Sequence, residues 1–92
     1  MALYNIVFKP SVEEDLRPLP KSVVVRVMGH IEHLKADPIP RQAIKLSGAE
    51  RLYRIRVGDY RIVYQVDARA KQVTIHYVRH RREVYRTLRP PR

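Results

Sequence analysis

Residues 50–66 constrain the fold more than any other stretch of the chain, because two runs of alternating β-branched and aromatic residues flank the dipeptide Gly58-Asp59. Such a pattern is typical of a β-hairpin. A two-residue loop that begins with glycine suits a primed turn, because glycine adopts a positive φ without steric cost. The turn predicts three cross-strand pairs: Val57 with Tyr60, Ile55 with Ile62, and Tyr53 with Tyr64.

The two faces of this hairpin differ in chemistry. Side chains alternate along a strand, so the three pairs share one apolar face, which we assign to the core. The opposite face carries Leu52, Val63 and Gln65 together with three arginines: Arg54, Arg56 and Arg61. Arg56 lies opposite Arg61, and like charges in that arrangement destabilise a sheet. A solvated surface would tolerate arginine, but their convergence without an acid favours a surface that binds a polyanion.

Charge and length restrict the class of protein. The chain has 92 residues with 19 Lys and Arg against 9 Asp and Glu, a net charge of +10. This points to nucleic acid, an anionic membrane or an acidic protein as partner. The absence of cysteine excludes disulfides and thiolate metal sites. Residues 1–5 lack signal-peptide features and no apolar run reaches about 18 residues, so we expect a soluble, cytoplasmic protein without a membrane segment.

The rest of the chain predicts one domain over residues 1–92. Residues 3–8 have the composition of a strand, and residues 11–14 fit a capping box with Ser11 at the N-cap of a short helix. Apolar residues recur at spacings of three and four over residues 21–36 and predict a second helix. Its inward stripe comprises Val23, Val24, Val27, Met28, Ile31 and Leu34.

A last strand is predicted over residues 72–78, followed by a short helical tail. Pairing Val66 with Val73 places Ile75 and Tyr77 on the core face, and Thr74, His76 and Val78 on the face of the arginines. His76 would then lie across from Val63. The predicted fold class is α+β: an N-terminal strand, a two-helix hairpin packed on one face of a mainly antiparallel four-stranded sheet, and the helical tail.

Two motifs stand out in the chain: residues 52–64, Leu-Tyr-Arg-Ile-Arg-Val-Gly-Asp-Tyr-Arg-Ile-Val-Tyr, and residues 80–85, His-Arg-Arg-Glu-Val-Tyr. Together they resemble the RelE/ParE family of bacterial and archaeal toxins from toxin–antitoxin pairs. The resemblance implies an RNA-facing concave surface opposite the helices. It also implies one of two activities, since RelE-like members cleave messenger RNA in the ribosomal decoding site whereas ParE-like members poison DNA gyrase.

The RelE-like pattern assigns roles to particular residues of this chain. Its basic and aromatic positions fall on Arg54, Arg56, Arg61, Arg81 and Tyr85. All five are filled, which favours a metal-independent endoribonuclease. The first two positions are often lysine in the family. Arginine does not readily give up its proton, which leaves the identity of the general base open.

The expected chemistry is attack by the RNA 2′-hydroxyl on the adjacent phosphorus, with no metal or cofactor. Arg61 and Arg81 would clamp the scissile phosphate, and Tyr85 would stack on a base or orient a hydroxyl. His80, ranked ahead of His76, is the expected proton acceptor. The full set of predicted RNA-binding residues is Lys45, Arg54, Arg56, Arg61, His76 and Arg82.

The partners implied are the ribosome with its mRNA and an acidic, partly disordered antitoxin that covers the cationic face in a hetero-oligomer. Two alternatives stay open at this point. One is a ParE-like, non-enzymatic inhibitor of gyrase. The other is a basic module that binds an acidic partner and acts by obstruction. Either would need the positive surface but no proton acceptor.

Overall fold

The computed structural model describes residues 3–46 and 51–80. The elements follow in the order β1 (Asn5–Phe8), α1 (Pro10–Leu16), α2 (Lys21–His33), β2 (Ile44–Lys45), β3 (Leu52–Val57), β4 (Tyr60–Asp67) and β5 (Gln72–His80). The predicted helical tail lies outside the described residues, except for its first two residues, which extend β5. The α+β class is confirmed.

Within residues 3–46 and 51–80 the sheet has five strands, in the order β1-β5-β4-β3-β2, one more than predicted. β1 runs parallel to β5, and the other neighbours are antiparallel. The added strand, β2, lies in the proline-bearing stretch between α2 and β3. It has two residues, Ile44 opposite Arg54 and Lys45 opposite Tyr53, too few to show a period-2 pattern in the sequence.

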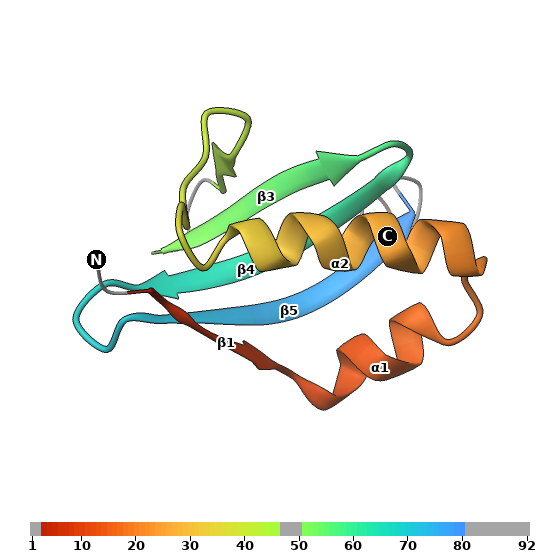
Figure 1. Ribbon diagram of the computed structural model, residues 1–92, viewed down its shortest axis with the longest axis horizontal. Coiled ribbons are helices and arrows are strands. Elements are labelled where there is room, and N and C mark those ends of the chain that lie inside the picture. The colour runs from red at the N-terminus through yellow and green to blue at the C-terminus, as the bar shows by residue number, and fades with distance from the viewer. Residues whose placement is uncertain (1–2, 47–50, 81–92) are drawn as a thin grey trace, which may run out of the picture.

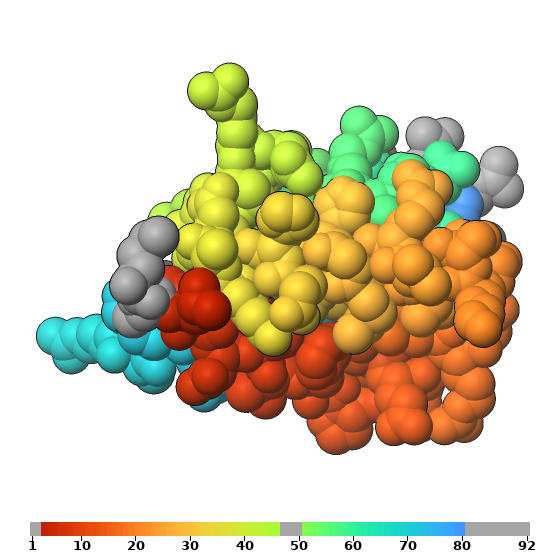
Figure 2. Space-filling model, viewed as in Figure 1, coloured from red at the N-terminus to blue at the C-terminus, as the bar shows by residue number. Residues whose placement is uncertain are grey.

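One face of the sheet is covered by α2, which crosses in front of β3 and β4, while α1 lies beside β1 and β5 (Figure 1). We call this the helix face. In the space-filling view from this side, the side chains of α2 and α1 occupy most of the surface (Figure 2). The predicted stripe of α2 is buried at Val27, Ile31 and Leu34, but Met28 is 38% exposed and does not belong to the core.

The helix boundaries correct two predictions. α1 begins at Pro10 with Lys9 as N-cap, and no side chain caps it. Proline supplies a helical φ at the first position, so the helix starts one residue before the predicted N-cap. Ser11 instead donates its hydroxyl to the carbonyl of His76 at 3.2 Å. α2 ends at His33, three residues before the predicted end.

The register of the β3–β4 hairpin is confirmed at every predicted pair. Gly58 has a φ of 61°, as a primed turn requires. The rings of Tyr53 and Tyr64 stack with centroids 5.9 Å apart. Tyr64 is fully buried and donates its hydroxyl to the carbonyl of Pro38 at 2.8 Å. Burial raises the pKa of the Tyr64 phenol well above its ordinary value.

The β4–β5 register contains an irregularity that reverses two predicted faces. Val66 pairs with Val73 as expected, but Tyr64 pairs with Ile75 and its neighbour Val63 pairs with Tyr77. His76 is therefore the extra residue of a β-bulge, and it shifts the alternation by one. As a result Tyr77 leaves the helix face and Val78, only 2% exposed, takes a place in the core. The predicted faces of Tyr77 and Val78 are wrong for this reason.

Candidate functional site

Three arginines form a row across three neighbouring strands. Arg56 of β3 pairs with Arg61 of β4, and Arg61 pairs with Arg79 of β5. Paired residues share a face, so the row lies on the side of the sheet opposite the core, which we call the arginine face. The predicted convergence of Arg56 and Arg61 is confirmed. Arg79 was missed, because the sequence assigned it to a tail and the bulge that aligns it was not foreseen.

A second row lies beside the first: Arg54 of β3 pairs with Val63 of β4, and Val63 pairs with Tyr77 of β5. Val63 is only 2% exposed, which makes it a buried apolar residue between these two longer side chains. The Nε atom of Arg54 is buried and has no hydrogen-bond partner within the described part of the chain. A buried donor of this kind is costly unless something else satisfies it, which marks the position as a candidate for a ligand oxygen.

Tyr77 and Arg79 are in direct contact on this face. The guanidinium carbon of Arg79 lies over the Tyr77 ring, 4.6 Å from its centroid. Burial raises the pKa of the Tyr77 phenol, and the charges of Arg79 and Arg54 partly offset that rise. The phenol therefore stays protonated near neutral pH and can donate a hydrogen bond.

Asp15 connects α1 to the arginine face. Its Oδ2 atom accepts a hydrogen bond from the backbone N–H of Val78 at 3.1 Å, and its Oδ1 atom lies 3.9 Å from Nε of Arg79. The first contact satisfies a backbone donor next to the bulge. No local sequence pattern signals a contact between residues as far apart as Asp15 and Arg79.

His76 shares the arginine face but not the position expected for it. Tyr77, not His76, lies across from Val63. The Nε2 atom of His76 lies 3.3 Å from the side-chain oxygen of Gln65, which is two residues after Val63 on β4. Burial lowers the pKa of His76, and the charge of Lys9 lowers it further.

Two other predicted site residues do not reach the arginine face. His80 pairs with Tyr60, and the two rings meet edge to face with centroids 5.4 Å apart, so His80 lies on the helix face. Lys45 is exposed on β2 opposite Tyr53, which also belongs to the helix face. The remaining predicted residues, Arg81, Arg82 and Tyr85, lie outside the described residues.

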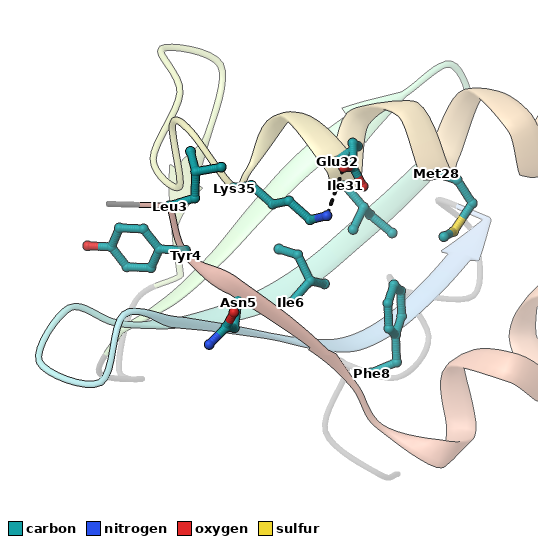
Figure 3. A pocket seen from close by; sticks show the side chains of 9 residues that line it. All are labelled: Leu3, Tyr4, Asn5, Ile6, Phe8, Met28, Ile31, Glu32 and Lys35. Carbon is teal, nitrogen blue, oxygen red and sulfur yellow. Dashed lines mark hydrogen bonds and ion pairs between the residues drawn. The ribbon is translucent and has the colours of Figure 1, made fainter. Parts of the chain in front are cut away.

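The helix face has a separate hollow between β1 and α2, with a volume of about 550 Å³. In Figure 3, Ile6 and Phe8 of β1 project toward Ile31 and Met28 of α2, and an ion pair joins Lys35 to Glu32 at 2.8 Å. The lining is mostly apolar, and it lies on the side of the sheet away from the arginines. This hollow and the arginine face are therefore two different surfaces.

Neither a metal site nor a membrane-spanning helix is found among the described residues. No group of three or more His, Asp or Glu side chains among residues 3–46 and 51–80 is placed to hold a metal ion. None of the helices in those same ranges is long and apolar enough to cross a membrane.

Comparison with known proteins identifies the family. Residues 6–85 match the model of the ParE toxin of the type II toxin–antitoxin system parDE. RelE1 of Methanocaldococcus jannaschii is 35% identical over 66 residues, which are 68% of this chain and 73% of RelE1. The archaeal RelE–RelB complex from Pyrococcus horikoshii contains a chain with a TM-score of 0.76 and 34% identity, over 85% of this chain and 94% of that one.

A structure of a double arginine-to-alanine mutant of Escherichia coli RelE in the free state has a TM-score of 0.76 at 27% identity, covering 94% of this chain and 93% of that one. The family match spans both the arginine-bearing hairpin and the two helices. The chain therefore belongs to the RelE/ParE family of toxins from type II toxin–antitoxin systems.

Proposed function

We propose that this chain is a toxin that cleaves messenger RNA on the translating ribosome. The observation that carries the proposal is the row of Arg56, Arg61 and Arg79 on one face of the sheet. Three aligned like charges cost stability, and a phosphodiester backbone would neutralise them. The buried Nε of Arg54 beside the row adds a donor that a phosphate oxygen would satisfy.

RNA supplies its own nucleophile, which is why such a site needs few groups. When the 2′-hydroxyl is aligned with the adjacent phosphorus, attack produces a phosphorane with added negative charge and expels the 5′-oxygen of the next nucleotide. Guanidinium forks bind phosphate oxygens in pairs and stabilise that charge. In this proposal Arg61, with Arg81, clamps the scissile phosphate, while Arg54 and Arg56 bind the neighbouring backbone.

Two histidines, His76 and His80, are candidates for accepting the proton of the 2′-hydroxyl. His76 shares the arginine face, whereas His80 pairs with Tyr60 on the other face. Because the pKa of His76 is lowered, its ring is neutral near pH 7 and can accept a proton. We therefore prefer His76 to His80 as the protein's proton acceptor, with groups of the RNA and ribosome as the alternative. Tyr85 keeps its two proposed roles, stacking on a base or orienting a hydroxyl.

An antitoxin is the proposed protein partner. The relatives from P. horikoshii and M. jannaschii were crystallised as RelE–RelB complexes. A domain with a net charge of +10 would be steered toward an acidic chain and neutralised by it. We propose that such an antitoxin covers the arginine face in the cytoplasm, where ribosomes are found. The affinity of the purified pair should fall as the salt concentration rises.

Inhibition of DNA gyrase is the second candidate, because the matching family model describes a ParE toxin. A gyrase inhibitor would need a complementary surface and no chemistry. The two functions therefore differ in whether single arginine changes abolish an RNA cut or only weaken a protein contact.

The test is primer extension on a translated message after the toxin is expressed, with gyrase supercoiling measured in parallel. Arg61→Ala should lower cleavage by roughly a hundredfold, the effect of losing one transition-state donor. Arg69→Ala is the matched control, since it removes an arginine from the turn between β4 and β5. Added EDTA that leaves ribosomes intact should not stop the cut. Intact toxicity of Arg61→Ala together with inhibited supercoiling would favour the gyrase function instead.

A further inference from the structure

The β-bulge brings an aromatic ring and a guanidinium together at the end of the arginine row. In an uninterrupted strand Tyr77 would point into the core, but the extra residue His76 turns it to the arginine face. Arg79 lies over its ring at 4.6 Å and pairs with Arg61 across the sheet. The pair is thus next to the proposed phosphate clamp but is not part of it.

Asp15 fixes the geometry of this pair from outside the sheet. One carboxylate oxygen accepts the Val78 N–H at 3.1 Å, and the other lies 3.9 Å from Arg79. The Arg79 and Asp15 side chains are 30% and 17% exposed, so the ion pair is partly shielded from water. Val78 lies between Tyr77 and Arg79 in the chain, and holding its backbone therefore holds the spacing of the two planar groups.

Planar groups on a positive surface suit single-stranded nucleic acid. An unpaired base stacks on an aromatic ring or on a guanidinium plane, and the stack tolerates any base because each has a π-face. A guanidinium that already lies over a ring gains a cation–π contact and adds charge for the adjacent phosphate. Phosphate binding alone would not require a ring at this place.

We propose that Tyr77 and Arg79 form a stacking platform for an RNA base next to the scissile phosphate, with Asp15 as the positioning residue that holds it. The proposal rests on the proposed function, since it takes RNA as the substrate. It adds a contact to the base, in addition to the backbone contacts of the arginine row. Loss of the platform should change which positions in a message are cut, and not only how fast.

The first experiment measures binding of the purified full-length protein to two probes, a hexa-adenylate RNA and an abasic strand of equal length and charge. The parent should bind the adenylate about fivefold or more tightly, as expected for one stacked base. Tyr77→Leu and Arg79→Lys should each reduce that ratio toward one. Arg79→Lys keeps the charge and loses only the plane, so its affinity for the abasic strand should be retained.

Three variants separate the platform from a general structural effect. Tyr77→Phe keeps the ring and should retain the preference for the adenylate. Tyr4→Leu is the matched control, because Tyr4 makes a similar cation–π contact with Lys71, 5.2 Å from its ring centroid, at the other end of the sheet. Asp15→Asn can still accept the Val78 N–H but loses its charge. It should lower the ratio of adenylate to abasic binding by a few-fold, because the loss of a negative charge acts on both strands alike.

The second experiment maps cut sites by primer extension for the same variants. A redistribution of cuts in Tyr77→Leu and Arg79→Lys, absent in Tyr4→Leu, is the expected result. An unchanged adenylate preference in folded Tyr77→Leu and Arg79→Lys would overturn the platform, even if the parent cuts messages. Conversely, if the preference is present and lost in the variants but no message is cut by the parent, the platform stands and the proposed function is wrong.

Discussion

The two faces of the central hairpin are made by alternate residues of the same strands, yet they differ in charge and in how their apolar residues pack. On the helix face, Ile62 and Tyr64 are fully buried in the apolar cluster beneath α2. On the arginine face, Val63 is the buried apolar residue between Arg54 and Tyr77 and lies outside that cluster. This difference indicates that the residues that stabilise the fold and the residues proposed to bind RNA lie on opposite faces, so substitutions one residue apart should have different consequences.

The sharpest test of this separation compares Ile62 with its neighbour Val63. Ile62→Ala should lower the free energy of unfolding by about 2–5 kcal/mol, because it removes buried methyl and methylene groups and leaves a cavity. Val63→Ala removes two methyl groups from the other face and should cost markedly less. Urea denaturation of both variants measures the difference. Equal losses would show that the arginine face contributes to stability as much as the helix face.

The extent to which the sequence predicts these faces depends on how each strand is connected. The β3–β4 register could be counted because Gly58 and Asp59 form a two-residue loop, and a loop of that length fixes every later pair. This predicted Arg56 opposite Arg61 and the core position of Ile62. The apolar periodicity of residues 21–36 likewise predicted α2, with an error only at its end and at the exposed Met28.

The β4–β5 register could not be counted in the same way. Val73, Ile75 and Tyr77 alternate as in an uninterrupted strand, so nothing local marks His76 as the extra residue. The bulge is accommodated by tertiary contacts with the α1 region. Lys9 N–H bonds to the Ile75 carbonyl at 3.0 Å, and the Ser11 hydroxyl bonds to the His76 carbonyl. For the same reason Tyr77, Arg79 and Asp15 were missed as candidate site residues. His80, the expected proton acceptor, lies on the helix face.

Removing one hydroxyl from the helix face should have an intermediate effect. Tyr64→Phe leaves the ring in place but deletes the donor to the Pro38 carbonyl, a bond of 2.8 Å. We expect a loss of about 1–2 kcal/mol in unfolding free energy, because a partly buried carbonyl loses its partner. Thermal or urea unfolding can detect this change. Tyr53→Phe, on the same face of β3, is the control for a change of tyrosine to phenylalanine.

On the arginine face, removing a charge should raise the free energy of unfolding instead of lowering it. Arg56→Gln relieves the cross-strand repulsion with Arg61 and should raise the unfolding free energy by about 0.2–1 kcal/mol at low salt. The gain should shrink at high salt, where charges on the surface are screened. RNA cleavage should fall in the same variant. A destabilised Arg56→Gln protein would mean that the arginine row contributes to folding, contrary to the comparison.

The smallest expected effect is a change in how stability depends on pH. Burial and the charge of Lys9 lower the pKa of His76 in the folded protein, whereas in the unfolded chain the pKa is about 6.5. At pH values between these two pKa values the unfolded state binds more protons than the folded state. Stability should therefore rise with pH through this window and be independent of His76 above it. His76→Gln keeps a polar group near Gln65 and removes the titration. Urea unfolding at pH 5 and pH 7.5 measures how much unfolding free energy is lost on acidification, and this loss should be smaller in His76→Gln than in the parent. The control is His33→Gln, a change at an exposed position of α2, which should behave as the parent does. An equal loss in His76→Gln and the parent would show that the histidine on the arginine face is not held in the neutral form by folding, and it would remove the reason for preferring His76 as the proton acceptor.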